Sequence, residues 1–325
     1  ALIVQDVGLA ALISRCIPDL RLHVSTQMNV HSSYGIEAAA ALGAKRVTLA
    51  RELSLPEINR LVVAAHELGL EVETFGHGAL CICYSGQCFM SSMIGGRSAN
   101  RGLCAQACRL PYKLIDSLDP NRELKAPGDF LLSPKDLCSI DHLDRLASLN
   151  VDSLKIEGRM KSSEYVSSVV SVYREALDRL RERLDGADGI ENAGGVEGFD
   201  SDGDKGGNDG PNRTSIAEST ARRIRVRPTE QEKEKLASVF SRGFSPAYLV
   251  GERSGEMMSY QRPNNRGQFA GRVKTIRDGI IHLGCEISLE AGDLLEFWTR
   301  KGNTVYQLPS DFESSRKTVY IPLDD

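Results

Sequence analysis

Five of the eight cysteines in this chain of 325 residues lie in one stretch, GALCICYSGQCFMSSMIGGRSANRGLCAQACR, at positions 78–109. They are Cys81, Cys83, Cys88, Cys104 and Cys108. Three kinds of chemistry could explain such a group: a set of disulfides, a metal or iron–sulfur site, or a nucleophilic thiol with spare thiols around it. A nucleophile requires one thiol of low pKa rather than five, so the crowding argues against the third explanation.

The start of the chain bears on the choice between disulfides and metal. The opening residues, ALIVQDVGLAALIS, contain Asp6 and lack the basic start of a secretory signal, and no apolar run approaches the ~18 residues that span a bilayer. We therefore expect a cytoplasmic protein with no membrane partner. Disulfides are rare in that compartment, and clustered cysteines there bind metal or carry out redox chemistry.

The spacing of the cysteines favours a cluster over zinc. The close C-x-x-C pairs of zinc ribbons are absent from the stretch. Wide and irregular spacing suits a cubane 4Fe–4S cluster, whose bulky inorganic core can be held by several loops. Buried, unreactive thiols are the alternative explanation.

A second group of candidate residues lies in the motif KIEGR. Alternation along a strand would place Lys155, Glu157 and Arg159 on one face, which is unusual for a buried strand unless they line a polar pocket. If a small dianion binds, Arg159 and Lys155 are the natural partners of its carboxylates. An internal ion-pair network without a ligand is the alternative. His77, shortly before Cys81, could donate a proton, lie beside the cofactor or be a hydrogen-bonded structural residue.

Nucleic acid could bind only at a local patch, because the net charge of −4 provides no global basic field. The one dense basic run is ARRIRVR at 221–227. Its alternating arginines could face phosphates, or they could form a solvated edge that prevents aggregation.

Strands and helices alternate in the part of the chain that must position these residues. Apolar strand-like segments occur at 2–6, 20–26, 45–50, 71–75 and 151–157, with helical patterns that include 55–69, 136–150 and 162–184. Such alternation predicts parallel strands joined by right-handed crossovers. Five strands are too few for a closed barrel, which takes about 250 residues, so we expect either an open sheet or a barrel whose first strands precede residue 1. The apolar run at the very start favours the second.

Three parts are expected along the chain. Residues 1–184 would form the strand–helix domain with the cysteine cluster. Residues 185–215, rich in Gly, Asp and Asn, would form a disordered linker because they offer little apolar surface to bury. Residues 216–325 would form a β-rich accessory domain, a small barrel or sandwich, since short alternating runs follow a helix at 228–240.

These motifs together resemble peptidase family U32, the collagenase-like proteins. The likeness is carried by ETFGHGALCICYSGQCFMSS (73–92), GRSANRGLCAQACRLPYKL (96–114) and the segment from SPKDLCSID through KIEGRM to VYREALD (133–178). The resemblance implies an α/β fold, an incomplete TIM-like (β/α) barrel followed by a small β-rich accessory domain. It also implies a 4Fe–4S cluster held by Cys81, Cys88, Cys104 and Cys138, with Cys108 as a candidate substitute.

The function implied by the resemblance is hydroxylation of an RNA base. Members described as oxygen-independent hydroxylases act on tRNA or 23S rRNA with prephenate as co-substrate, and others hydroxylate the ubiquinone ring. We therefore predict an RNA hydroxylase, with Lys155, Glu157, Arg159 and His77 as candidate catalytic residues. A collagenase-like peptidase is the first alternative, although the chain has no G-x-S-x-G elbow and no H-E-x-x-H motif. A non-catalytic binding protein with a structural cluster is the second.

Overall fold

Two compact units make up the chain in the computed structural model. The structure describes residues 1–159, 161–191, 227–251, 254–265, 267–299, 302–313 and 318–322. The first unit runs from Ala1 to Arg266 and the second from Gly267 to Asp325. This division falls later in the chain than the expected boundaries at 184 and 216, so that the segment 227–265 belongs to the first unit.

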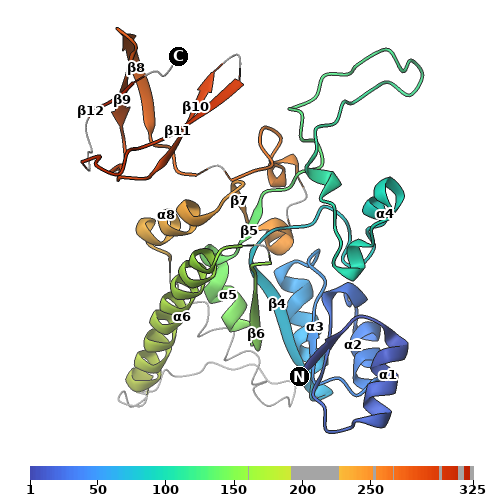
Figure 1. The fold of residues 1–325 in the computed structure, drawn as a ribbon. Helices are drawn as coiled ribbons and strands as arrows, with labels where there is room; N and C mark the ends of the chain where they lie inside the picture. Colours follow the sequence, from blue (N-terminus) through green and yellow to red (C-terminus); the bar gives the residue numbers. More distant parts are fainter. Residues whose placement is uncertain are drawn as a thin grey trace, which may run out of the picture. The chain divides into compact units, whose positions relative to one another are not determined.

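Strands and helices alternate through the first part of the first unit (Figure 1). The parallel strands are β1 (Leu2–Val4), β2 (Leu22–Val24), β3 (Arg46–Thr48), β4 (Glu71–Gly78) and β6 (Ser153–Glu157). The helices after the first three are α1 (Val7–Cys16), α2 (Ser33–Ala41) and α3 (Leu55–Glu67). The expected α/β architecture with parallel pairing is confirmed. Among the described residues the strand order stays open and does not close into a barrel.

Strand β4 is the centre of the sheet, because three strands pair with it. Strand β6 lies parallel to Glu73–Gly78, whereas β3 pairs with Glu71–Glu73 and β5 (Asp136–Cys138) pairs antiparallel with His77 and Gly78. A strand has two edges, so β3 and β5 share the edge that β6 leaves free. Strand β7 (Phe244–Ser245) continues the sheet parallel to β5. Segments far apart in sequence therefore meet at the carboxyl end of β4.

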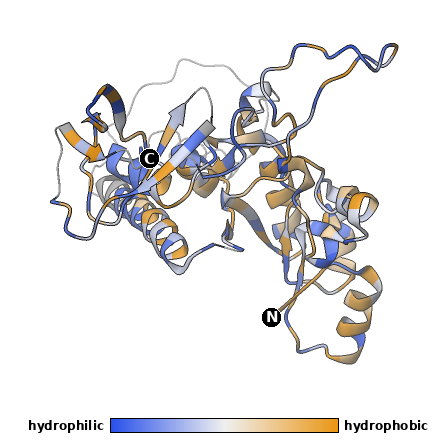
Figure 2. Cartoon of the chain, turned by 45° about the horizontal axis from the view of Figure 1, so that its top comes forward, coloured by the Kyte–Doolittle hydropathy of each residue, from blue (hydrophilic) through white to orange (hydrophobic). Residues whose placement is uncertain are grey.

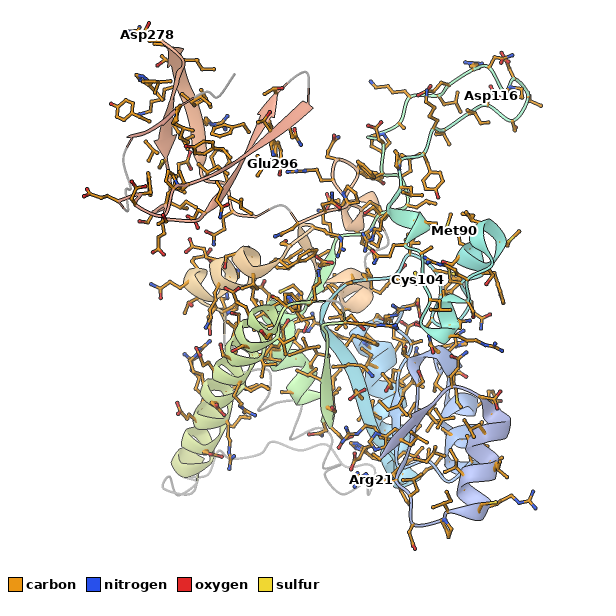
Figure 3. All side chains as sticks on the ribbon, viewed as in Figure 1. Arg21, Met90, Cys104, Asp116, Asp278 and Glu296 are labelled. Carbon is orange, nitrogen blue, oxygen red and sulfur yellow. The ribbon has the colours of Figure 1, made fainter. Side chains whose placement is uncertain are left out.

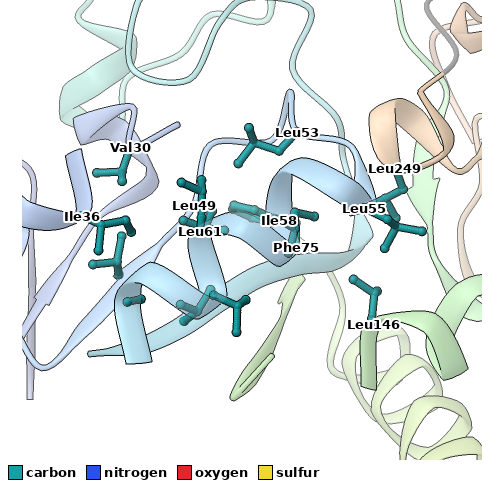
Figure 4. Close-up of a cluster of buried hydrophobic side chains, with 14 of the residues drawn as sticks. Val30, Ile36, Leu49, Leu53, Leu55, Ile58, Leu61, Phe75, Leu146 and Leu249 are labelled. Carbon is teal, nitrogen blue, oxygen red and sulfur yellow. The ribbon is translucent and has the colours of Figure 1, made fainter. Parts of the chain in front are cut away.

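Helix α3 shows how local sequence builds this unit. Pro56 stands in the first turn, and the Glu57 carboxylate accepts the backbone N–H of Ser54 at 2.8 Å, which satisfies a donor that the helix leaves open. Gly69 follows the helix with a φ of 69°, where a residue without a Cβ is unstrained. The buried face consists of Leu55, Ile58, Leu61, Val62 and Ala65. It packs into the main core together with Phe75 and Leu49 (Figure 4).

A second core joins three helices of the same unit. Helix α6 (Ser163–Glu191) packs against α8 (Glu230–Val239) and α5 (Leu143–Ser148). The buried residues are Ile140, Leu143, Tyr165, Val169, Val172, Tyr173, Ala176 and Leu236. An ion pair of 2.8 Å between Arg179 and Glu232 also joins α6 to α8. These contacts explain why α8, which we expected in the accessory domain, belongs to the first unit.

Two expected element boundaries differ from the structure. The helical pattern at 136–150 begins instead with strand β5, because Asp136–Cys138 pairs with β4 and β7 before the helical turns start. Helix α6 continues through Glu191, so the first residues of the expected linker at 185–215 are helical. Residues 192–215 of that linker, and 221–226 of the basic run, lie outside the described residues.

The second unit is built from antiparallel strands. Strands β8 (Gly271–Arg277), β9 (Ile280–Cys285) and β12 (Thr318–Pro322) form one sheet with β9 in the middle, and β10 (Leu294–Thr299) pairs with β11 (Gly302–Gln307). Asp278 and Gly279 join β8 to β9 with φ values of 51° and 72°, as a tight hairpin turn requires. The core consists of Ile281, Leu283, Leu289, Leu295, Leu308, Val319 and Ile321.

The edge of the sheet at β1 carries exposed apolar side chains. Leu2 and Ile3 of the strand are 43% and 53% exposed, and Val7, Leu9 and Leu12 of α1 are exposed as well. Figure 2 shows the hydrophobic colouring of the helix beside the N-terminus. Helices of the described part of the chain all lack either the length or the apolar character needed to cross a membrane.

Candidate functional site

The cysteine segment starts where β4 ends. After Gly78 the chain forms helix α4 (Met90–Gly95) and two short 3₁₀ turns, η2 (Ala99–Arg101) and η3 (Ala107–Arg109). Figure 3 labels Met90 and Cys104 in this segment. Gly78 has a φ of 113°, and a Cβ there would collide with the carbonyl oxygen of Glu157 on β6. Only glycine therefore allows β4 to approach β6 so closely and then turn into the segment.

Ser85 anchors the cysteine segment to the end of β3. Its backbone N–H donates to the Glu52 carboxylate at 3.0 Å, and its hydroxyl oxygen accepts the backbone N–H and the Nε–H of Arg51, both at 3.2 Å. Ser85 is fully buried, so these bonds are shielded from water. Next to it, Gly86 lies so close to the carbonyl oxygen of Gln27 that no Cβ would fit.

Arg159 anchors the same segment to the end of β6. Its Nη2 donates to the carbonyl oxygen of Gly102 at 2.8 Å, and its backbone N–H donates to the Glu157 carboxylate at 2.9 Å. Two of the three KIEGR candidates, Glu157 and Arg159, therefore stand beside the cysteine segment. In α/β proteins with parallel strands, functional sites lie at this carboxyl edge of the sheet.

The thiols of the cysteine segment lie within electrostatic range of one another. Burial raises the pKa of the Cys108 thiol against the opposing effect of Arg109, and Cys81, Cys104 and Cys88 raise it further. Burial likewise raises the pKa of Cys83, with contributions from Cys88 and Cys81. All five are free thiols. The structure thus brings together the five cysteines that the sequence groups.

The thiols of the cysteine segment are candidate donors for a metal centre. Among the described residues, no three Cys, His, Asp or Glu side chains stand close enough to share one metal ion. Thiolates around a single zinc ion lie about 3.8 Å apart, given tetrahedral Zn–S bonds of about 2.3 Å. A cubane core is much larger than one ion and separates its thiolates more widely. Thiolates are the ligands that iron–sulfur clusters use, and the described side chains do not form the cage of a single ion.

Cys138 lies in a different setting from the loop cysteines. It faces His77 across the β4–β5 pair, and its sulfur is 3.9 Å from the hydroxyl oxygen of Tyr173. Burial raises the pKa of Cys138 to about 11. It lines a cavity of about 190 Å³ together with Asp141 and Lys233. Of the two candidates for a fourth ligand, Cys108 lies within electrostatic range of Cys81, Cys88 and Cys104.

His77 is buried among aromatic rings. The ring centroids of Phe244, Tyr173 and Tyr165 lie 5.4, 5.5 and 6.1 Å from its own. Burial lowers the pKa of His77 to about 4, although Asp136 acts in the opposite direction. The imidazole is therefore neutral at pH 7 and holds no imidazolium proton to donate. Its Nδ1 lies 3.4 Å from the Tyr173 hydroxyl, as a structural histidine would.

Lys155 belongs to an internal ion-pair network. Its ammonium donates to the Glu73 carboxylate at 3.2 Å. The same carboxylate accepts the Thr48 hydroxyl at 2.9 Å and the Ser153 hydroxyl at 3.0 Å. Burial raises the pKa of Glu73, but Lys155 and these hydrogen bonds outweigh it and lower that pKa. The geometry of Lys155 matches the ion-pair alternative considered from the sequence.

Sequence reasoning missed three cations next to the cysteine segment: Arg109, Lys161 and Arg242. Arg109 follows Cys108 directly, and Lys161 comes shortly after the KIEGR motif, so the first two adjoin motifs that were singled out. This adjacency was the available signal, because Lys161 itself stands among polar residues in GRMKSSE. Arg242 comes from the segment between α8 and β7 and has no such signal.

Comparison with known proteins places the chain in a family. The family model described as peptidase family U32 matches residues 1–193, and the chain belongs to that family. A tRNA hydroxylation protein of Bacillus subtilis is 40% identical over 54% of this chain and 42% of its own length. The Escherichia coli 23S rRNA 5-hydroxycytidine synthase is 43% identical over 56% of this chain and 26% of its own length.

A relative from Porphyromonas gingivalis carries a different kind of name. This collagenase is 30% identical over 90% of the chain and 63% of its own length. The chain spans less than half the length of the Bacillus subtilis and Escherichia coli proteins. No solved structure shows a significant match to it.

Proposed function

We propose that this chain is part of an iron–sulfur enzyme that hydroxylates an RNA base without molecular oxygen. The observation that carries the proposal is the gathering of Cys81, Cys88, Cys104 and Cys108 at the carboxyl edge of the sheet. The names of the RNA-modifying relatives supply the reaction and the substrate class. A cytoplasmic location follows from the RNA substrate and is part of the proposal.

Cys81, Cys88 and Cys104 would hold a 4Fe–4S cluster together with a fourth thiolate. Motif resemblance assigns the fourth position to Cys138, whereas proximity in the structure favours Cys108. The cluster would supply one-electron transfer or a Lewis acid at the carboxyl edge of the sheet. The anchors Ser85 and Arg159 would fix the segment that carries the thiolates, as supporting residues around metal ligands do.

Replacing C–H of a base by C–OH requires an oxygen donor, and the resemblance suggests prephenate, a dianion. Lys155 and Arg159 were the expected carboxylate partners. Lys155 is engaged by Glu73, and Arg159 donates one of its five N–H groups to the Gly102 carbonyl. We further propose that the parallel strands β1 to β4 and β6 are part of a TIM-like barrel, because they pair in the order in which they occur.

A collagenase-like peptidase is the second candidate, since the collagenase relative matches 90% of the chain. The geometry of the site supports it less well. His77 is buried, and its Nδ1 lies 3.4 Å from the hydroxyl of Tyr173, which itself donates to the Gly76 carbonyl at 2.8 Å. This pair therefore lacks the exposed hydroxyl that a nucleophile needs.

A deletion strain tests the proposed reaction. Its tRNA and rRNA nucleosides, separated and measured by mass spectrometry, should lack one hydroxylated base that the full-length wild-type gene restores. Cys88→Ser should fail to restore it, whereas Cys16→Ser, an exposed cysteine of α1, should restore it fully. Of Cys108→Ser and Cys138→Ser, the variant that fails identifies the fourth ligand.

The same strain separates the two candidate activities. Unchanged nucleosides together with gelatin cleavage by purified protein would replace the hydroxylase proposal by the peptidase one. Unchanged nucleosides without cleavage would favour the non-catalytic alternative.

A further inference from the structure

The three-stranded sheet of the second unit has one face turned away from the core. Ile281 and Leu283 of β9 are buried in that core, so His282 between them points to the opposite side, which we call the outer face. Residues that pair directly across an antiparallel sheet point to the same side. His282 pairs with Thr275 of β8 and with Tyr320 of β12. The outer face therefore extends over all three strands.

Three cations of β8 belong to this face. Arg272 and Arg277 pair with the residues of β9 two places after and two places before His282, so both share its direction. Lys274 is left out of the pairing where the register of β8 shifts, and its side chain lies against Gly284, where a Cβ would collide with it. All three cations are exposed. The edge strand thus carries a row of positive charges.

The carboxylates of the unit stand outside this row. Strands β8, β9 and β12 contain neither Asp nor Glu. Asp278 in the hairpin turn, labelled in Figure 3, and Glu286 just after β9 stand at the two ends of the strand pair. Within the described part of the chain, neither forms an ion pair with Arg272, Lys274 or Arg277. The other acidic residues that the structure describes in this unit lie on β10 or in loops: Glu290, Asp293, Glu296, Asp311 and Glu313.

Aromatic rings lie exposed among the cations. Tyr320 is 62% exposed, and its ring meets that of His282 edge to face at a centroid distance of 4.8 Å. Phe269 is 55% exposed, and the guanidinium carbon of Arg272 lies 5.4 Å from the centre of its ring. Charges on an edge strand can serve only to prevent aggregation, but that role does not require exposed rings beside them. Rings interleaved with cations are the pattern on which bases stack while the backbone phosphates meet the charges.

We propose that the outer face binds a single-stranded segment of RNA. Tyr320 would stack on a base, and Arg272, Lys274 and Arg277 would contact phosphates. The inference rests on the proposed function, which supplies RNA as the partner, and it adds the place where the RNA is held. A single strand fits better than a duplex, because only an unpaired base offers a free face to an aromatic ring. An acidic polypeptide would engage the cations but would leave Tyr320 without a stacking partner.

Fluorescence anisotropy of the full-length protein with a labelled oligouridylate of about 12 nucleotides tests the face. Lys274→Met should weaken binding about fivefold at about 0.1 M salt and lower the slope of log affinity against log salt by about 0.7, the contribution of one phosphate contact on a single strand. The matched control is Lys125→Met, an exposed lysine of the first unit, which should bind like the wild type.

Substitutions of Tyr320 separate stacking from charge. Tyr320→Ala should weaken binding about fivefold or more, with the salt dependence unchanged. Tyr320→Phe keeps the ring and should bind like the wild type. A duplex RNA of the same length should bind more weakly than the single strand, and Tyr320→Ala should not affect it.

Three results would overturn the face. One is the absence of measurable RNA binding to folded wild-type protein. Another is equal binding by the wild type, Lys274→Met and Tyr320→Ala. The third is displacement of the RNA by polyglutamate at equal charge, together with no effect of Tyr320→Ala, which would assign the cations to an acidic polypeptide.

The nucleosides of the deletion strain keep this proposal apart from the proposed function. If the wild-type gene restores the hydroxylated base while neither substitution weakens RNA binding, only the face is wrong. If no base is hydroxylated although Lys274→Met and Tyr320→Ala both weaken RNA binding, the face stands and the proposed reaction is wrong.

Discussion

Replacing Lys161 by methionine should stabilise the protein at neutral pH. The pKa of Lys161 lies at about 8 instead of its ordinary 10.5, chiefly because of burial. This difference corresponds to at most ~3.4 kcal/mol, and partial exposure of the side chain reduces it to ~1–2 kcal/mol. Methionine keeps most of the apolar stem and carries no charge, but it loses the contact with the Phe240 ring, worth about 0.5–1 kcal/mol. The expected net gain is ~1 kcal/mol.

The gain should depend on pH in a defined direction. Below pH 8 the ammonium is charged in both the folded and the unfolded chain, and the folded state bears the full penalty. Between pH 8 and 10.5 the folded wild type releases this proton while the unfolded chain still holds it, so the wild type gains stability as the pH rises. Lys161→Met has no such proton. Its advantage should therefore shrink across this window.

Urea unfolding followed by circular dichroism at pH 7, 8.5 and 10 measures this effect. Lys125→Met should show no comparable change in stability at any of the three pH values. If Lys161→Met is less stable than the wild type at pH 7, or if its advantage stays constant up to pH 10, then the ammonium is not held among repelling cations and the reasoning is refuted.

Three further substitutions test the positioning of the site. Gly78→Ala should lower the free energy of unfolding by more than ~2 kcal/mol in thermal or urea unfolding, because its Cβ would meet the Glu157 carbonyl; an effect below ~0.5 kcal/mol would show that β4 and β6 are not so close. Tyr173→Phe should cost ~0.5–1.5 kcal/mol, since the Tyr173 hydroxyl loses its bond to the Gly76 carbonyl at 2.8 Å and the Ser139 N–H keeps only its bond to that carbonyl at 2.9 Å; no loss would contradict the bonds of the hydroxyl. Leu236 of α8 is fully buried in the core that α8 shares with α6. Leu236→Ala should therefore lower the free energy of unfolding by ~2–5 kcal/mol, and a smaller effect would mean that α8 packs elsewhere.

The regular part of the fold was predictable from the sequence. The strand-like segments at 2–6, 45–50 and 71–75 correspond to β1, β3 and β4, and the capped pattern at 55–69 corresponds to α3. In each case a long helix or an apolar alternation signals the element locally. Strands β5 and β7 were not foreseen, because their formation depends on tertiary pairing: β5 joins the free edge of β4, and β7 joins β5.

The candidate site was predictable only in part. Cys81, Cys88 and Cys104 are grouped in the sequence, and they are grouped in the structure. The setting of Cys138 could not be inferred, since it depends on its pairing opposite His77. The meeting of Lys161 and Arg242 on the Phe240 ring also depends on tertiary packing, because segments distant in sequence converge there. Spacing along a chain contains no information about such convergence.

Iron and acid-labile sulfide, measured in the full-length protein purified without oxygen, test the central claim most directly. The account predicts about four of each per chain. It predicts their loss in folded Cys88→Ser and their retention in Cys16→Ser, whose exposed cysteine lies in α1. Folded protein without iron, or a Cys88→Ser variant that keeps its full iron content, would contradict it.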